Sequence, residues 1–340
     1  MKWKLLNWPL DPGSSELWTE FLDAAQMPTQ YGSAHFFTDP FVRGGERFAI
    51  AAMDAQQKIA ALATGVQRSG TVTCGLPSRP QVFFRNDVDR QEAMHCLFEG
   101  IVKTWDPKFV QMVSWGEIDG IERFGLDRGK DSGNNEVVLL DLSLGYETLF
   151  KNFSSARRNG IRKAGRYGVE ITRLEAEQDI DALYEIHVQW NQRKGNEPDD
   201  IDAFRSGVRQ TDSRAVFIAK FEGKVIAGSY FRFLNGGVME YAGNNSFEEH
   251  QHLKPNELLL AHAIRWACTR DLKTFSLGGA HPFLQRFGGE VVRTSVYTSD
   301  RTFLQLHRRR EDLLQLRSKF IQLVGKKNKE RIARLVGRTV

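Results

Sequence analysis

The pattern of hydrophobic and polar positions in the first third of the chain predicts a helix, a hairpin, a second helix and a buried strand, in that order. Apolar residues at helical spacing follow Ser14, and the apolar segments 48–53 and 59–67 are separated by a polar turn, which is typical of a hairpin. A helix with one apolar face is predicted from about 90 to 105, and an apolar run predicts a buried strand over 109–115.

The second half of the chain predicts the same order of elements again. Two helical segments precede a three-stranded meander, a crossover helix and a further strand, over the ranges 149–167, 177–192, 215–221, 225–234, 238–243, 256–270 and 274–279. A crossover helix allows the strands on either side of it to run parallel. An antiparallel sheet with one parallel step can leave a gap where two strands diverge, and an extended ligand could bind the exposed strand edges there.

Residue types repeat together with the elements. The segment 115–125 aligns with 278–288 at a shift of 163 residues, and both segments end in the triplet Arg-Phe-Gly. A repeat of this length indicates duplicated domains. We therefore predict an α/β (α+β) fold of two tandem domains, each a mixed and mainly antiparallel sheet flanked by helices, over 1–143 and 144–305, with a basic helical tail over 306–340.

The composition fits two soluble domains in a reducing compartment. The chain has 340 residues, of which 41% are hydrophobic, and no apolar stretch reaches the ~18 residues of a membrane span. Its three cysteines lie far apart without a Cys-x-x-Cys pair, which argues against disulfides and a zinc site. Asn7 and Pro9 interrupt the N-terminal apolar patch too early for a signal peptide. We expect a cytoplasmic protein that needs no metal.

The positive charge is concentrated at the C-terminus. The chain carries +5 overall, but residues 306–340 contain eleven Lys and Arg against three acidic residues, so the remainder is mildly acidic. The segment 313–336 reads as an amphipathic helix with an apolar stripe beside a basic face. Docking on the protein body is the default expectation, and contact with an anionic membrane surface at the inner membrane or with tRNA are the alternatives.

Four segments carry a resemblance to a known family. The segment 151–171 is similar to the basic helix that opens the second domain of FemAB-like transferases, and 223–245, 254–279 and 283–290 resemble the core of the same superfamily. Within it, the chain resembles most the CelD-like acyltransferases linked to bacterial exopolysaccharide systems. The resemblance covers roughly residues 145–300 and implies tandem GNAT-like domains, the first of them degenerate, that transfer an acyl or aminoacyl group to an amine.

The resemblance implies an acyl-thioester co-substrate, either acyl-CoA or an acyl carrier protein. The acceptor would be an amino sugar or peptide amine in cell-envelope or exopolysaccharide synthesis. One alternative is a Fem-type peptidyltransferase that uses aminoacyl-tRNA. Another is a non-catalytic GNAT-like ligand-binding protein. Two departures bear on this choice, because Ser276 stands where relatives commonly carry an acid, and no glycine-rich pyrophosphate loop precedes the helix at Asn256.

Acyl transfer to an amine needs a proton acceptor and a hydrogen-bond donor for the developing oxyanion. The polar segment 241–257 lies between a strand and a helix N-terminus, and His281 follows the glycines that end the last strand. The candidate catalytic residues are His281, Glu257 and Tyr241, and the candidate donor-binding residues are Asn244, Asn256, Gly278, Gly279 and Arg286. Each candidate also has a purely structural interpretation. The segment 241–257 would be a solvated loop followed by a helix start, and His281 a lone histidine without a role. Tyr241 would be a core residue of its strand, and Arg286 with the glycines after it would form a helix cap.

The segment 151–171 places five cations on one short helix. If Ser154 or Ser155 caps this helix, Arg157 and Arg158 lie in its opening turn, where cations oppose the helix macrodipole. A bound phosphate would relieve this conflict, so we predict acceptor or phosphate binding by Arg158, Arg162 and Lys163. The alternative is a solvated basic face.

Overall fold

The computed structural model describes residues 1–129, 135–307 and 309, so the predicted tail lies almost entirely outside the described residues. Within the described part, the strands of both halves join in one continuous sheet. Its main path runs in the order β1, β2, β3, β4, β7, β15, β9, β14, β13, β12, β11 and β10. The predicted α/β class with a mainly antiparallel sheet is confirmed.

The first half follows its hydrophobic pattern closely. The predicted helix at 90–105 is α3, with Asp89 as its N-cap, and the predicted strand at 109–115 is β7. Its helices and strands are β1 (Lys2–Leu6), α1 (Pro12–Ala24), α2 (His35–Thr38), β2 (Glu46–Met53), β3 (Ile59–Arg68), β4 (Thr71–Leu76), β5 (Arg79–Pro80), β6 (Val82–Phe84), α3 (Arg90–Trp105), β7 (Phe109–Trp115), β8 (Asp127–Arg128) and β9 (Glu136–Asp141).

The described part of the second half has three α-helices more than the pattern predicts, because one predicted helix is split and two short helices, 201–208 and 282–285, were not predicted. The segment read as a single helix over 149–167 is two helices, because the chain is extended at Phe153 and Ser154 caps the second one. The remaining elements are α4 (Gly145–Asn152), α5 (Ser155–Arg166), β10 (Glu170–Arg173), α6 (Glu177–Lys194), α7 (Ile201–Val208), β11 (Arg214–Phe221), β12 (Lys224–Phe233), β13 (Val238–Ser246), α8 (Pro255–Ala267), β14 (Thr274–Gly279), α9 (Pro282–Gln285) and β15 (Glu290–Asp300).

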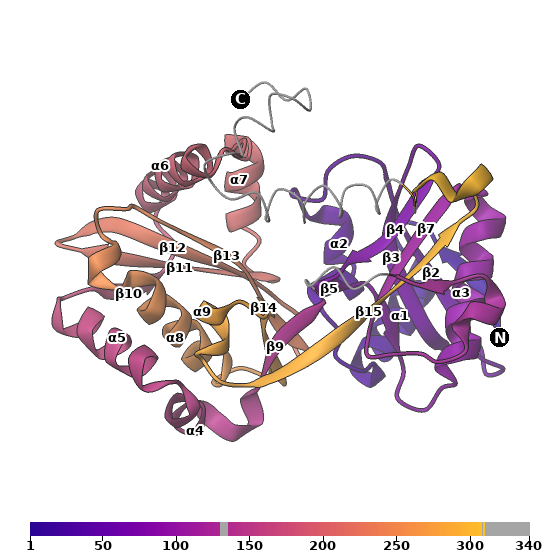
Figure 1. Ribbon diagram of the computed structural model, residues 1–340, viewed down its shortest axis with the longest axis horizontal. Coiled ribbons are helices and arrows are strands. Elements are labelled where there is room, and N and C mark those ends of the chain that lie inside the picture. Colours follow the sequence, from indigo (N-terminus) through magenta and orange to yellow (C-terminus); the bar gives the residue numbers. More distant parts are fainter. Residues whose placement is uncertain (130–134, 308, 310–340) are drawn as a thin grey trace.

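The two halves of the chain share strands. β9 precedes the predicted boundary at residue 143, yet it pairs antiparallel with β14 of the second half. β15 is long enough to serve both halves, because its first residues pair with β9 and its residues from Thr294 onward pair with β7. Figure 1 shows β15 running from one half of the molecule to the other. The sheet is therefore continuous across the predicted domain boundary.

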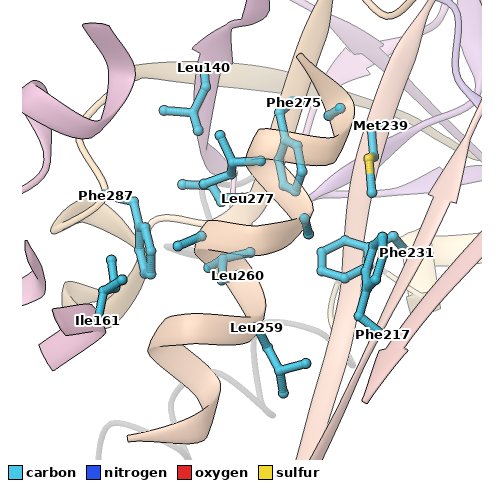
Figure 2. Packing of buried hydrophobic residues seen from close by; sticks show 14 of the residues in the cluster. Leu140, Ile161, Phe217, Phe231, Met239, Leu259, Leu260, Phe275, Leu277 and Phe287 are labelled. Atoms are coloured by element: carbon cyan, nitrogen blue, oxygen red, sulfur yellow. The ribbon is translucent and has the colours of Figure 1, made fainter. Parts of the chain in front are cut away.

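The largest core of the second half lies between its sheet and the helices α4, α5, α8 and α9. Phe217, Phe231 and Phe275 are at most 1% exposed and pack toward Leu259 and Leu260 of α8, as Figure 2 shows. A smaller core on the opposite face packs α6 and α7 against β11 and β12. With both faces covered by apolar side chains, the charged residues of these strands can lie only near the sheet's open edge or in cavities.

Each half contains one parallel step, and the two steps differ. In the first half, β7 pairs with β4 from Thr71↔Phe109 to Cys74↔Met112, and β6 then continues the pairing at Val82↔Ser114. In the second half, β13 and β14 pair only from Val238↔Thr274 to Glu240↔Ser276. The first parallel step is therefore closed along its length, whereas the second opens after Glu240 and Ser276.

Candidate active site

The opening between β13 and β14 contains a cavity of about 180 Å³, which we call the donor cavity. Its walls are the two diverging strands, the start of α9 and a loop of the first half. The residues that line it include Arg79, Arg232, Glu240, Tyr241, Ala242, Gly278, Gly279 and His281. The predicted gap between parted strands is present, and it is not filled by side chains.

A β-bulge shapes the wall of this cavity. The β12–β13 register shifts between Tyr230↔Gly243 and Phe231↔Tyr241, which leaves Ala242 as the extra residue of β13. A bulged residue has no partner in the neighbouring strand, so its main chain can turn toward a ligand. Ala242 lines the donor cavity at this point, and its N–H is therefore a candidate donor to a developing oxyanion.

A second cavity, of about 400 Å³, lies on the α6–α7 side of the sheet and between the two halves. We call it the interdomain cavity. The second half supplies most of its lining, and the first half contributes Tyr31, Phe41 and Arg79. Arg79, Arg232 and Ala242 line both cavities. Two ligands could therefore approach Ala242 from two sides, as transfer between a donor and an acceptor requires.

A row of charged side chains crosses the sheet beneath the interdomain cavity. Arg214 of β11 is opposite Arg232 of β12, which is opposite Glu240 of β13. All three are at most 5% exposed. Arg214 donates to Asp39 from the first half in a fully buried ion pair, and burial lowers the pKa of Arg214. These charges give the two halves a polar as well as an apolar interface.

His187 and Asp199 form the far wall of the interdomain cavity. The His187 Nε2 lies 3.3 Å from the Asp199 carboxylate and 3.1 Å from the Asp199 main-chain N–H, and its Nδ1 lies 3.3 Å from the Asn245 Oδ1. The hydrogen bond with His187 lowers the pKa of Asp199. Because both ring nitrogens have partners, His187 is suited to positioning Asn245 and the 199 loop.

The three predicted catalytic residues lie in different surroundings. Tyr241 and His281 both line the donor cavity, and burial raises the pKa of Tyr241 so that its phenol stays protonated. His281 is exposed at the N-terminus of α9. Glu257 instead forms an ion pair of 3.1 Å with Arg157, whose side chain is 5% exposed. Glu257 therefore neutralises a buried cation and does not line either cavity.

The predicted donor-binding residues are also divided. Gly278 and Gly279 line the donor cavity, and Gly278 has a φ of +78°, which a residue with a Cβ would adopt at a cost. Asn244 lines the interdomain cavity. Asn256 donates to the Ser246 Oγ over 3.3 Å, and Arg286 is an exposed residue at the end of α9. The last two residues line neither cavity.

The cations of α5 have protein partners that a sequence does not reveal. Ser154 caps the helix by accepting from the Arg157 N–H, and Arg157 is neutralised by Glu257. Arg158 donates to the carbonyl groups of Lys151 and Phe153 at the end of α4. The predicted conflict with the macrodipole is thus relieved within the protein, without a phosphate. Arg162 is exposed, and Lys163 lies 5.2 Å from the ring of Tyr167.

Sequence reasoning missed the charged residues between the halves. Their signal was present for Arg232, which stands between two phenylalanines, and for Glu240, which stands between Met239 and Tyr241. A single charge inside an apolar strand indicates a buried partner or a ligand. No local signal could pair these residues with Arg79 or Asp39, which are more than a hundred residues away in the chain.

Comparison with known proteins agrees with this geometry. Residues 151–287 match the family model described as the acetyltransferase (GNAT) domain. A crystal structure of FemX superposes with a TM-score of 0.70 at 12% identity, covering 91% of this chain and 100% of FemX. The protein has the tandem GNAT fold.

Two further solved structures share this tandem GNAT fold. L-PGS from Bacillus licheniformis has a TM-score of 0.57 at 13% identity, over 88% of this chain and 95% of that one. A tandem GNAT protein from the clavulanic acid biosynthesis pathway has a TM-score of 0.54 at 10% identity, over 89% and 99%. No curated protein sequence matches the chain. Within the described ranges of this tandem GNAT protein, no helix is both long and apolar enough to span a bilayer.

Proposed function

We propose that the protein is an N-acyltransferase that holds the carbonyl group of an acyl donor in the donor cavity and the amine of an acceptor in the interdomain cavity. The observation that carries this proposal is the opening after Glu240 and Ser276, which leaves a cavity between two parted strands. The GNAT match over residues 151–287 supports acyl transfer as the reaction class and an acyl-thioester as the co-substrate.

The reaction we propose is direct attack of a neutral amine on the thioester carbonyl carbon. The ammonium group of the acceptor first gives a proton to His281, which is exposed to solvent at the cavity, and the resulting neutral amine attacks the carbonyl carbon. The main-chain N–H of Ala242 stabilises the oxyanion. The carbon–sulfur bond breaks as the oxyanion collapses, and the phenol of Tyr241 gives its proton to the leaving thiolate while it takes up the extra proton of the attacking nitrogen, so that Tyr241 ends protonated, the form that burial favours. Gly278 and Gly279 leave room for the donor at the end of β14.

A second candidate donor also has support. No glycine-rich pyrophosphate loop of the kind that binds CoA precedes Asn256. The superposition with FemX covers the whole of that protein, which supports an aminoacyl ester as an alternative donor at the same cavity. The CelD-like function in exopolysaccharide or cell-envelope synthesis stays a proposal that rests on the sequence resemblance. The cytoplasmic location and the contact of the basic tail with tRNA or an anionic membrane are proposals of the same kind.

Thermal-shift measurements with acyl-CoAs, aminoacyl-tRNA and UDP-sugars separate these candidates, because a ligand that binds the native state raises its apparent stability. Stabilisation by an acyl-CoA, together with thiol release when an amine is added, would support the thioester donor. Stabilisation by aminoacyl-tRNA alone would support the aminoacyl donor. If neither donor class stabilises the full chain, the transferase proposal fails and a non-catalytic binding role takes its place.

The variant Ala242→Phe tests the location of the donor. The added ring would occupy the point where the two cavities meet, so donor stabilisation and thiol release should both be lost. Arg286→Ala is a matched control, because Arg286 is exposed and lines neither cavity. Equal activity of the wild type and Ala242→Phe would contradict the proposed site.

A further inference from the structure

Arg79 is a cation without a protein partner among the described residues. It lies in β5, on the loop that carries residues of the first half into both cavities, and it is half-buried. No hydrogen bond or ion pair of its guanidinium is found within the ranges 1–129 and 135–307. The nearby charge of Arg232 is the main cause that lowers the pKa of Arg79, so the two guanidinium groups repel each other across the cavity.

Arg232 faces the same space with unused hydrogen-bond donors. It is 3% exposed, and its Nη1 donates to the Tyr31 hydroxyl over 3.1 Å. Its Nε lies 3.6 Å from the Glu240 Oε2, which is too long for a hydrogen bond. The Nε and Nη2 of Arg232 and the Oε2 of Glu240 are all buried without a hydrogen-bond partner among the described residues. Groups of this kind are costly to bury unless a ligand completes them.

The charges around this space do not cancel. Arg79, Arg214 and Arg232 with Arg43, the partner of Asp199 over 2.8 Å, supply four positive charges, and Asp39, Asp199 and Glu240 supply three negative charges, which leaves one positive charge in excess. Asp39 is already bound to Arg214. A ligand with a single negative charge would neutralise the cluster, whereas a doubly charged phosphate would overcompensate it.

We infer that the acceptor carries a carboxylate, and that Arg79 and Arg232 bind it between the two halves of the molecule. This inference rests on the proposed function for the identity of the ligand as an acceptor. Guanidinium groups bind carboxylates through paired hydrogen bonds in the plane of the group, which suits two arginines with unused donors. The amine of the same molecule lies toward Glu240 and the bulge at Ala242, so the acceptor class is an amino acid or a related amino carboxylic acid.

The inference assigns a task to the first half of the chain. Arg79 and Tyr31 both come from it, and both line the interdomain cavity. The loop that closes the parallel step of the first half is the loop that carries Arg79. The first half therefore selects the acceptor, while the second half holds the donor.

The test compares amino acids and amino sugar acids with their primary amides, which differ only at the carboxylate, together with inorganic phosphate. Thermal shift and calorimetric titration of the full chain report binding. We expect at least one carboxylate to bind the wild type and its amide to bind at least about tenfold more weakly, since hydrogen bonds to charged groups are lost. Arg79→Met should abolish the difference in affinity between acid and amide. Arg79→Lys should weaken binding of the carboxylate, because a lysine lacks the paired donors of a guanidinium group.

Stability without a ligand separates recognition from a structural role. Arg79→Met removes a cation whose largest charge interaction is the repulsion by Arg232, set against smaller attractions to Glu240 and Asp39, so the melting temperature should stay equal or rise, with the exposed Arg209→Met as the control. A lower melting temperature for Arg79→Met, equal binding of acids and amides, or binding of phosphate in place of every carboxylate would overturn the inference. Stabilisation by the donor is measured separately. If no donor stabilises the wild type, that result counts against the proposed function alone.

Discussion

In both halves of the molecule a crossover helix joins two parallel strands, but the course of the chain after the last parallel pair differs between the halves. After Cys74 in the first half, the chain makes an excursion through β5 and returns as β6, which pairs with both β3 and β7. After Glu240 in the second half, β13 continues past a one-residue bulge, and none of the described strands fills the opening. The same topology thus gives a closed sheet in one half and a cavity in the other.

Under our proposal, this difference divides the tasks between the two halves. The first parallel step is closed, and the loop that leaves it carries Arg79 to both cavities of the second half. The excursion and the bulge occur at corresponding points, two residues past the last parallel pair. That the first half is degenerate for donor binding stays a proposal.

The largest expected effect comes from filling the opening between β13 and β14. Ala242→Phe should lower the transfer rate at least about 100-fold, because a misplaced donor loses its alignment with the amine. Leu76→Phe is the matched control, since Leu76 lies at the corresponding position past the closed step and is 51% exposed. The transfer rate is measured by thiol release. An equal loss of rate in the two variants would contradict the distinction between the open and the closed parallel strand pair.

The next effect concerns the contact between the halves. Asp39→Asn should lower the free energy of unfolding by about 3–5 kcal/mol, because Arg214 would remain buried without a carboxylate. Urea unfolding followed by fluorescence measures this change. Glu177→Gln, which removes an exposed ion pair with Arg209, should change it little. If Asp39→Asn is as stable as Glu177→Gln, the buried pair does not hold the halves together.

A smaller loss is expected at the start of α8. Glu257→Gln should lower the free energy of unfolding by about 1–3 kcal/mol, because Arg157 is buried and loses its charged partner. Donor and acceptor binding by the folded variant should be unchanged, as Glu257 lines neither cavity. A stable variant with a large fall in kcat and a shifted pH profile would instead restore Glu257 as a catalytic residue.

The smallest effect appears in acid. The pKa of Asp199 is lowered in the folded state by its hydrogen bond with His187, so its stabilising contribution is complete above the unfolded pKa of about 3.9. This contribution is lost as the pH falls through the lower, folded pKa. Asp199→Asn should therefore flatten the fall in melting temperature below about pH 4. An identical acid profile of variant and wild type would contradict the role of this pair.

Local patterns predicted much of the fold. Periodicity gave the bounds of α3, β7 and β14, and the repeated order of elements gave the parallel step and its gap. The pairing of β9 and β15 with strands of the other half could not be predicted, because it joins segments more than a hundred residues apart in the chain. The strands β4, β5 and β6 lie in a segment for which the pattern predicted no element.

The candidate site was only partly predictable for the same physical reason. Tyr241, Gly278, Gly279 and His281 lie beside a gap that a local pattern reveals, and the structure brings them together at the donor cavity. Glu257 and Arg158 looked like site residues because their charges had no visible partners in the sequence. Tertiary contacts supply those partners, Arg157 for the first and the end of α4 for the second.

Amide hydrogen exchange read by mass spectrometry tests the central claim most directly, because it compares both parallel steps in one experiment. An acyl-CoA and, separately, aminoacyl-tRNA are added to the full chain. We predict that exchange slows at 241–246 and 276–279 with the true donor and stays unchanged at 74–84. Protection confined to 74–84, or no protection at 241–246 with either donor, would contradict the account.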